Sequence, residues 1–175
     1  MHILTNKKPA FVVGIDPDAE KSGWGVVNVK ERIVVRIDTI SFPDLVTELK
    51  SLRDRQLSAD NRDDVLVVIE GGWLNKGNWH IQHGMTVTKA AALGRHTGMN
   101  HQTGMMIAEL CKAWGINYRV VQPLRKGWKG PNGKITHEEF NNFAPLPKNR
   151  TSQDARDATL LAWVYADLPI RVKSI

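Results

Sequence analysis

The sequence predicts an α/β domain built on a five-stranded mixed sheet, in which a three-stranded antiparallel meander is joined to two parallel strands and flanked by helices. Segments 10–15 and 65–70 are almost uniformly apolar and each leads to a carboxylate, as expected for strands covered on both faces. Two runs rich in β-branched residues follow the first segment, and later segments have helical apolar spacing. The 175 residues suffice for one domain, residues 1–175, with a full core.

The first three strands form the predicted meander. The run 10–15 is closed by Asp16 and Pro17, and a proline disfavours helical backbone at the residue before it, so the strand should end at Asp16. Segments 23–29 and 32–40 flank a charged turn and are predicted to be the second and third strands.

Helices and parallel strands account for the middle of the chain. Pro43 opens a helix with leucines at helical spacing, and this helix returns the chain to strand 65–70, which should lie beside the first strand. The pattern from Thr86 to Trp114 is helical but contains three glycines, which predicts two helices or one broken helix. Segment 118–123 is the predicted fifth strand.

Two more helices are predicted near the C-terminus. Thr136 and Glu139 have the spacing of a capping box, which opens a short helix through Phe143. The last helix begins within 151–154, carries its apolar residues on one face and runs to Pro169.

Charge indicates a polyanionic partner. Lys and Arg total 24 against 18 Asp and Glu, a net charge of +6. Segment 124–134, the basic loop, holds four basic residues and no acidic one beside glycines and a tryptophan, a composition suited to phosphates. Cys111 is the single cysteine, and neither a membrane span nor a secretory signal is present. We therefore expect no membrane association and a cytoplasmic protein.

Four acidic residues are the main candidates for chemistry: Asp16, Glu70, Asp154 and Asp157. The first two end predicted neighbouring strands, and the last two share a face of the final helix. If that helix abuts the strand ends, the carboxylates meet and need bound cations to stay ionised, and oxygen ligands favour Mg²⁺ or Mn²⁺. Each also has an ordinary structural interpretation, as a turn residue, a strand-end charge or a favourable charge at a helix N-terminus.

Three segments around these acids carry a family resemblance. GIDPDAEKSGWGVV (14–27), VIEGGW (68–73) and QDARDATLLAW (153–163) resemble, in order and spacing, motifs of the RuvC family of Holliday-junction resolvases in the ribonuclease H-like superfamily. Asp18 departs from that family's usual glycine, whereas Gly23 and Gly25 match its small positions.

The resemblance implies a ribonuclease H-like fold and a Mg²⁺-dependent endodeoxyribonuclease. It would hydrolyse phosphodiesters at four-way DNA junctions in recombination or repair, as a homodimer. The four acidic residues named above would be its catalytic metal ligands, holding two Mg²⁺ ions about 4 Å apart that activate a water and stabilise the leaving oxygen, with Mn²⁺ able to substitute.

Six residues are candidates for DNA binding. Aromatic rings can stack on bases, and flexible ammonium or guanidinium groups bind phosphates without reading sequence. The candidates are Trp73, Trp79, Arg95, Lys126, Lys129 and Lys134. The histidines are scattered without the spacing of a zinc site and are predicted to be surface or loop residues.

Other functions fit parts of this pattern. A nuclease of the same fold could act on flaps, forks or RNA/DNA hybrids, and a junction-binding module could lack catalysis. An actin-like or sugar-kinase ATPase also has a Gly-x-Asp after its first strand, but it needs a second such domain. The dimer interface is predicted on the helix after Gly84.

Overall fold

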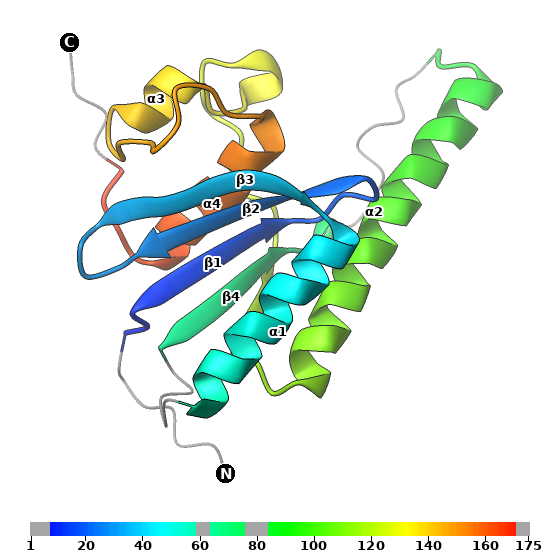
Figure 1. The fold of residues 1–175 in the computed structure, drawn as a ribbon. Helices are drawn as coiled ribbons and strands as arrows, with labels where there is room; N and C mark the ends of the chain where they lie inside the picture. Colours follow the sequence, from blue (N-terminus) through cyan, green and yellow to red (C-terminus); the bar gives the residue numbers. More distant parts are fainter. Residues whose placement is uncertain (1–7, 59–63, 76–83, 171–175) are drawn as a thin grey trace.

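The computed structural model describes residues 8–58, 64–75 and 84–170. Its sheet has the strand order β3-β2-β1-β4-β5, with β1, β2 and β3 antiparallel and with β1, β4 and β5 parallel (Figure 1). The strands are β1 (Phe11–Asp16), β2 (Lys21–Asn28), β3 (Ile33–Ser41), β4 (Val65–Glu70) and β5 (Tyr118–Val121). This confirms the predicted five-stranded mixed sheet, in which an antiparallel meander is joined to two parallel strands.

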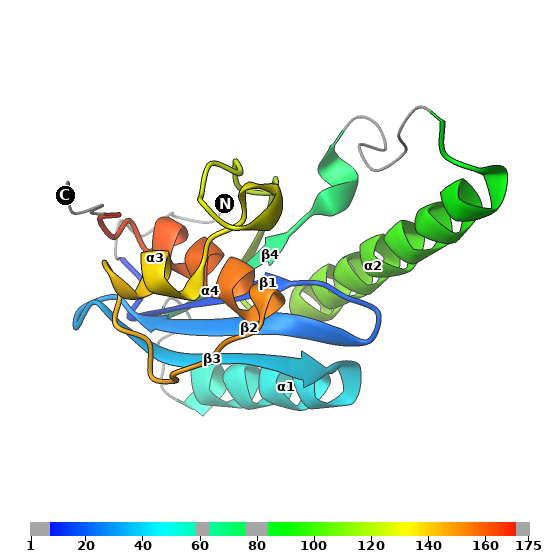
Figure 2. The ribbon, with the colours of Figure 1, turned by 90° about the horizontal axis from the view of Figure 1, so that it is seen from above.

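Helices cover both faces of the sheet. Seen edge-on in Figure 2, α1 lies on one side of the β1–β3 meander and α4 on the other. The helices are α1 (Phe42–Ser58), α2 (Val87–Ala113), α3 (His137–Asn141) and α4 (Gln153–Tyr165). Alternate side chains of β1 therefore enter different cores, Val12 with α3 and α4 and Val13 with α1 and α2. Among the described helices, none is long and apolar enough to cross a membrane.

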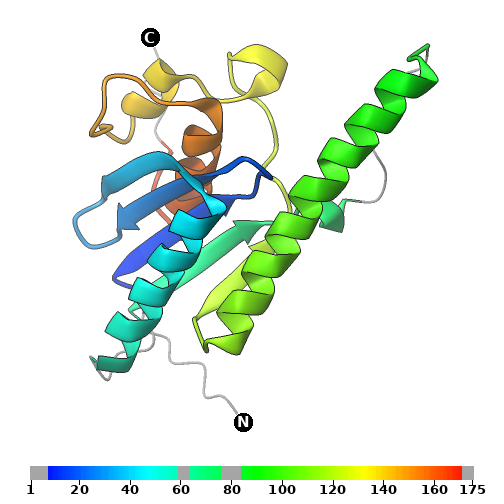
Figure 3. The same cartoon turned by 45° about the vertical axis from the view of Figure 1, so that its right-hand side comes forward.

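The predicted break in α2 is wrong. Val87–Ala113 is one helix of 27 residues, and its C-cap, Trp114, is followed by Gly115 with a φ of +66°. Gly94 and Gly98 have open space where a side chain would be, and Gly104 is buried beneath Trp73. A helical glycine costs only about 1 kcal/mol against alanine, which packing can offset. The N-terminal half of α2 extends past the body of the domain (Figure 3).

The capping predictions are confirmed. Thr136 and Glu139 form both halves of the capping box, although α3 ends at Asn141, before Phe143. Ser152 caps α4, accepting a hydrogen bond from the Ala155 amide. These caps satisfy helix N–H groups that have no partner inside the helix.

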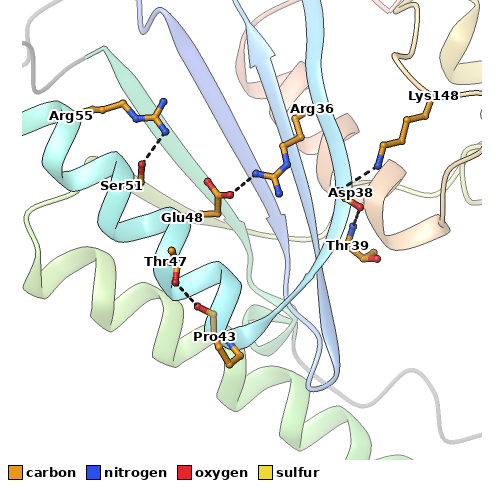
Figure 4. Close-up of polar contacts among 9 residues, drawn as sticks. All are labelled: Arg36, Asp38, Thr39, Pro43, Thr47, Glu48, Ser51, Arg55 and Lys148. Atoms are coloured by element: carbon orange, nitrogen blue, oxygen red, sulfur yellow. Dashed lines mark hydrogen bonds and ion pairs between the residues drawn. The ribbon is translucent and has the colours of Figure 1, made fainter.

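Polar contacts bind the edge strand β3 to its surroundings (Figure 4). Arg36 pairs with Glu48 of α1 at 2.6 Å, and Asp38 pairs with Lys148 of the segment before α4 at 3.4 Å. Such partly exposed pairs contribute at most about 1 kcal/mol each.

Candidate metal centre and its flanking hollows

Three aspartates meet where the end of β1 contacts the start of α4. Asp16, Asp154 and Asp157 each offer a carboxylate oxygen, and these oxygens lie within 4.8 Å of one another. The approach is this close because glycines face α4: a Cβ on Gly23 would lie 2.1 Å from the Asp154 carbonyl oxygen, and one on Gly14 would lie 1.9 Å from that of Ala158.

Glu70 belongs to the same electrostatic cluster, although it lies outside that group of three. It ends β4, the parallel neighbour of β1. Burial, followed by the charge of Asp157, raises the pKa of Glu70 to about 6. Burial and then the charges of Glu70, Asp157 and Asp154 raise the pKa of Asp16 well above its ordinary value. Burial and the neighbouring carboxylates therefore both disfavour the ionised forms of Asp16 and Glu70.

Lys134 partly neutralises the cluster. Its Nζ lies 2.8 Å from Oδ2 of Asp157, while Gln153 donates to Oδ1 of the same carboxylate at 2.7 Å. Burial alone would lower the pKa of Lys134, but the hydrogen bond and charge of Asp157, with Asp16 and Asp154, outweigh it and raise that pKa. One ammonium group against four carboxylates leaves an excess of negative charge.

The residues present fit a divalent cation that prefers oxygen. The four acidic side chains offer oxygen ligands alone. Burial and then the charges of neighbouring carboxylates raise the pKa values of Asp16 and Glu70, and a bound cation would relieve both effects. Asp16, Asp154 and Asp157 are the group that can hold such an ion together.

Replacing Lys134 with methionine should shift the pH dependence of metal binding upwards. Burial raises the pKa values of Asp16 and Glu70, and the positive charge of Lys134 lowers them. Both pKa values should therefore rise further when that charge is removed. In the wild type, Mn²⁺ affinity should fall as the pH drops through about 6, where Glu70 takes up its proton. Calorimetric titration with Mn²⁺ between pH 5 and 8 measures the midpoint. Lys129→Met, in the same loop, is the control, and an unmoved midpoint in Lys134→Met would contradict the electrostatic coupling.

The centre lies between two hollows. The first hollow, about 340 Å³, opens toward the basic loop and is lined by all four carboxylates and by Arg125, Lys126 and Lys134. The second hollow, about 280 Å³, opens toward α2 and is lined by residues that include Asp16, Glu70, Trp73, His96 and His101. The carboxylates thus lie where a basic wall and a neutral wall meet.

The predicted DNA-binding residues divide between these surfaces. Lys126 and Lys134 line the first hollow, and Trp73 lines the second. Lys129 is exposed in the basic loop, where its backbone N–H donates to Glu139 at 2.9 Å. Arg95 is exposed on α2, outside the linings of both hollows. Trp79 lies outside the described residues.

Trp73 packs against α2 rather than standing free. The six-membered end of its indole lies over Gly104, where a Cβ would be 2.4 Å from the ring. Its ring centroid is 6.3 Å from that of His101 in an edge-on arrangement. Stacking of Trp73 on a base stays a prediction, confined to the part of the ring that lines the second hollow.

Sequence reasoning missed several residues that line the hollows. Arg125 lines the first hollow beside Lys126, although it was not among the predicted DNA-binding residues. His96 and His101 were predicted to be ordinary surface or loop residues, but they lie on α2 and line the second hollow. Asn100 lines both hollows and binds the β1–β2 turn: its Nδ2 donates to Asp18 and its Oδ1 accepts from Ala19, each at 2.9 Å. The unusual Asp18 thus anchors α2. Asn100 is four residues before the buried Gly104, and this helical spacing could have placed it on the inner face of α2.

A second network behind the centre was also missed. Arg156 donates to the carbonyl of Ile135 at 3.0 Å and to Oε1 of Gln153 at 2.8 Å. Gln153 in turn donates to Asp157. The network fixes the end of the basic loop, and with it Lys134, against the first turn of α4.

Comparisons with known proteins add little to this geometry. No protein-family model matches the sequence, and no curated protein matches it. Among solved structures, the chain is similar to T. thermophilus RuvC in complex with a Holliday junction substrate, with a TM-score of 0.48 and 13% identity. The match covers 87% of this chain and 89% of that one. A likeness at this level assigns no activity, so function has to come from the residues of the site.

Proposed function

We propose that this protein is a metal-dependent endonuclease that hydrolyses phosphodiester bonds in branched DNA, with four-way junctions as its main substrate. The observation that carries the proposal is the group of aspartates, Asp16, Asp154 and Asp157, with Glu70 beside it and a basic loop along its rim. Carboxylates with an uncompensated charge suit a cation, and lysines and an arginine at their edge suit a phosphate backbone.

Each part of the site has a role in this reaction. Two Mg²⁺ ions, for which Mn²⁺ could substitute, would supply an activated water and stabilise the leaving oxygen. Asp16, Asp154 and Asp157 would hold them, with Glu70 completing the ligand set. Arg125 and Lys126 would bind the phosphates that flank the scissile bond. Gln153 would orient the carboxylate of Asp157 through its hydrogen bond of 2.7 Å.

The choice of a four-way junction depends on the three sequence motifs and on the basic character of the chain. Flaps, replication forks and RNA/DNA hybrids would present similar phosphates to the same loop. The test is cleavage of a junction, a flap, a duplex and a hybrid with Mg²⁺ at one fixed salt concentration, since electrostatic binding depends steeply on salt. Preferential cutting of the junction is expected. Preferential cutting of the hybrid would transfer the proposal to a ribonuclease, and binding without cutting would favour a non-catalytic module.

Paired cuts across a junction require two active sites, and we place the homodimer interface on one exposed face of α2. Val87, Gly94, Gly98 and Met105 recur at helical spacing on this face, which is angularly separate from Gly104 and Ile107 of the buried face. Val87 is 86% exposed, and a Cβ on either Gly94 or Gly98 would meet open space. A second copy of α2 could therefore approach closely and cover these apolar side chains.

Replacing Met105 with glutamate should dissociate this dimer. Met105 is 39% exposed, and a carboxylate there would be desolvated against the partner helix. Light scattering coupled to size exclusion should show a monomer that nicks junctions without cutting them in pairs. The matched control is Met99→Glu, since Met99 is 50% exposed on a different face of the same helix. A dimer that tolerates Met105→Glu but is dissociated by Met99→Glu would assign the interface to the other face.

A further inference from the structure

We infer that the second hollow is a subsite for a single unpaired nucleobase next to the bond that is cut, and that His96 and His101 determine which base it prefers. The inference rests on the proposed nuclease function and adds to it a direction for the substrate strand and a source of sequence preference.

The position of the second hollow ties its occupant to the metal centre. It shares Asp16, Pro17, Glu70 and Asn100 with the first hollow, so the two are adjacent across the carboxylates. A strand whose phosphate lies at the carboxylates would extend into both. The volume of about 280 Å³ lies near the lower end for small-molecule sites, enough for one base and its sugar but not for a duplex.

The chemistry of the two walls differs. The first hollow carries Arg125, Lys126 and Lys134, whereas the described residues that line the second include neither lysine nor arginine. Its charged residues are Asp16 and Glu70, which would repel a phosphate that lacks a bridging cation. A neutral ring with hydrogen-bonding edges suits this wall, and a backbone phosphate suits the other.

Packing holds two side chains of the second hollow, Trp73 and His101. Trp73 is seated over Gly104, and His101 lies edge-on to Trp73 with its Nε2 close to Gly72, where a Cβ would be only 3.0 Å away. Thr97 and His96 lie on the same inner face of α2. Imidazole nitrogens and a hydroxyl on one face of a helix can form hydrogen bonds with the edge of a base, and the exposed part of the indole can contact its face.

This arrangement also explains why branched DNA should be preferred. A base can enter the second hollow only after leaving its stack, and the free-energy cost of doing so is lowest where the base is already unpaired or mispaired. At a branch point the stack of base pairs is interrupted, so a base there leaves its stack at a lower free-energy cost than a base inside a duplex. The strand would then run from the basic loop, across the carboxylates, to α2.

The test is the base preference of cleavage on junctions randomised at the nucleotides that flank the cut. Sequencing of the products should show a roughly five- to hundredfold preference for the best base over the worst in the wild type, the range expected for one well-formed base contact. The double variant His96→Ala/His101→Ala should reduce that preference to within about twofold. Gln102→Ala, an exposed position beside His101, is the matched control and should keep the wild-type preference. Thr97→Val, which keeps the side-chain shape, is a milder second variant for the case that the double variant unfolds.

A second measurement separates this inference from the nuclease proposal. Junctions with 2-aminopurine beside the expected cut and a non-hydrolysable linkage at the cut are bound with Mg²⁺, so that the phosphate can be bridged to the carboxylates without cleavage, and fluorescence should rise as the base leaves its stack. The rise should be lost in the histidine double variant and kept in Gln102→Ala. A histidine variant with an unchanged base preference and an unchanged fluorescence rise would overturn the subsite. A wild type that shows the fluorescence rise but cuts no substrate would instead overturn the nuclease proposal and leave the subsite supported.

Discussion

Replacing Asp16 with asparagine should abolish DNA cleavage and, at the same time, stabilise the metal-free protein. Asp16 lies at the meeting point of the cluster, where burial and three neighbouring carboxylates raise its pKa. A bound metal contributes several kcal/mol of transition-state stabilisation, and each 1.36 kcal/mol is tenfold in rate. Loss of the central ligand should therefore reduce the rate by about 10³-fold or more, while binding to a junction persists because the basic loop is unchanged.

The gain in stability follows from the sign of the pKa shift. A carboxyl whose pKa is higher in the folded than in the unfolded state binds more protons when folded, so stability falls as the pH rises from the unfolded to the folded pKa. For Glu70, the rise from 4.5 to about 6 corresponds to a loss of about 2 kcal/mol across that pH range. The neutral amides of Asp16→Asn and Glu70→Gln avoid this loss, so both variants should melt a few degrees higher than the wild type at pH 7 in EDTA.

Bound metal should reverse this order of melting temperatures. A ligand that binds only the folded state at 100 times its Kd stabilises by about 2.7 kcal/mol, so Mg²⁺ or Mn²⁺ should raise the melting temperature of the wild type but not that of Asp16→Asn. Thermal unfolding with and without Mn²⁺, together with junction cleavage, measures both effects. Glu31→Gln, in the exposed turn between β2 and β3, is the control and should behave as the wild type. Cleavage by Asp16→Asn at the wild-type rate would contradict the proposal that Asp16 is a ligand of the catalytic metal.

The placement of the four carboxylates could be predicted from the sequence because local pattern determines it. Asp16 and Glu70 stand out because each ends an almost uniformly apolar run, and the pairing of β1 with β4 brings those ends together. Asp154 and Asp157 share a face because they are three residues apart on a helix with an identifiable cap.

The parts that the sequence did not reveal depend on tertiary packing. Nothing local to His96, Asn100 or His101 shows that α2 passes beside the carboxylates, since that path is fixed by the burial of Gly104 under Trp73 and by the hydrogen bonds between Asn100 and the β1–β2 turn. At Gly104, packing under Trp73 likewise supports the unbroken α2, where propensity alone predicted an interruption.

In the basic loop, too, the sequence did not reveal which lysine lies beside the carboxylates. Lys129 and Lys134 have similar sequence surroundings, yet only Lys134 reaches Asp157. Between them, Asn132 and Gly133 adopt φ values of +55° and +71°, which turn the chain back toward α4. Asparagine and glycine are the residues that tolerate this conformation, so the turn was compatible with the sequence, but its direction was not evident from it.

Replacing Gly23 with alanine should damage both stability and catalysis, because this glycine sets the distance between the sheet and α4. Gly23 pairs with Asp16 across the β1–β2 hairpin, and its missing side chain leaves room for the backbone of Asp154. A methyl group at this position would lie 2.1 Å from a carbonyl oxygen, a backbone atom that cannot rotate away. The helix must therefore shift, carrying Asp154 and Asp157 with it.

The expected cost has two components. Overpacking of this kind typically destabilises by about 1–3 kcal/mol, which should lower the melting temperature by roughly 2–12 °C for a chain of this size. A displacement of about 1 Å at a catalytic centre can reduce the rate about 100-fold. Gly23→Ala should thus keep the circular dichroism spectrum of the wild type but lose most of its cleavage and much of the metal-induced rise in melting temperature.

Two other glycine-to-alanine variants serve as comparisons for Gly23→Ala. Gly14→Ala obstructs α4 one turn further along, with a Cβ only 1.9 Å from the carbonyl oxygen of Ala158, and should lower the melting temperature at least as much. Gly127→Ala places its Cβ in open space within the basic loop and should change neither the melting temperature nor the rate of cleavage. If Gly23→Ala melted and cut like Gly127→Ala, α4 could not be seated on the β1–β2 hairpin as described. Asp154 and Asp157 would then lose the contact that holds them beside Asp16, and the metal centre would have to be built from other residues.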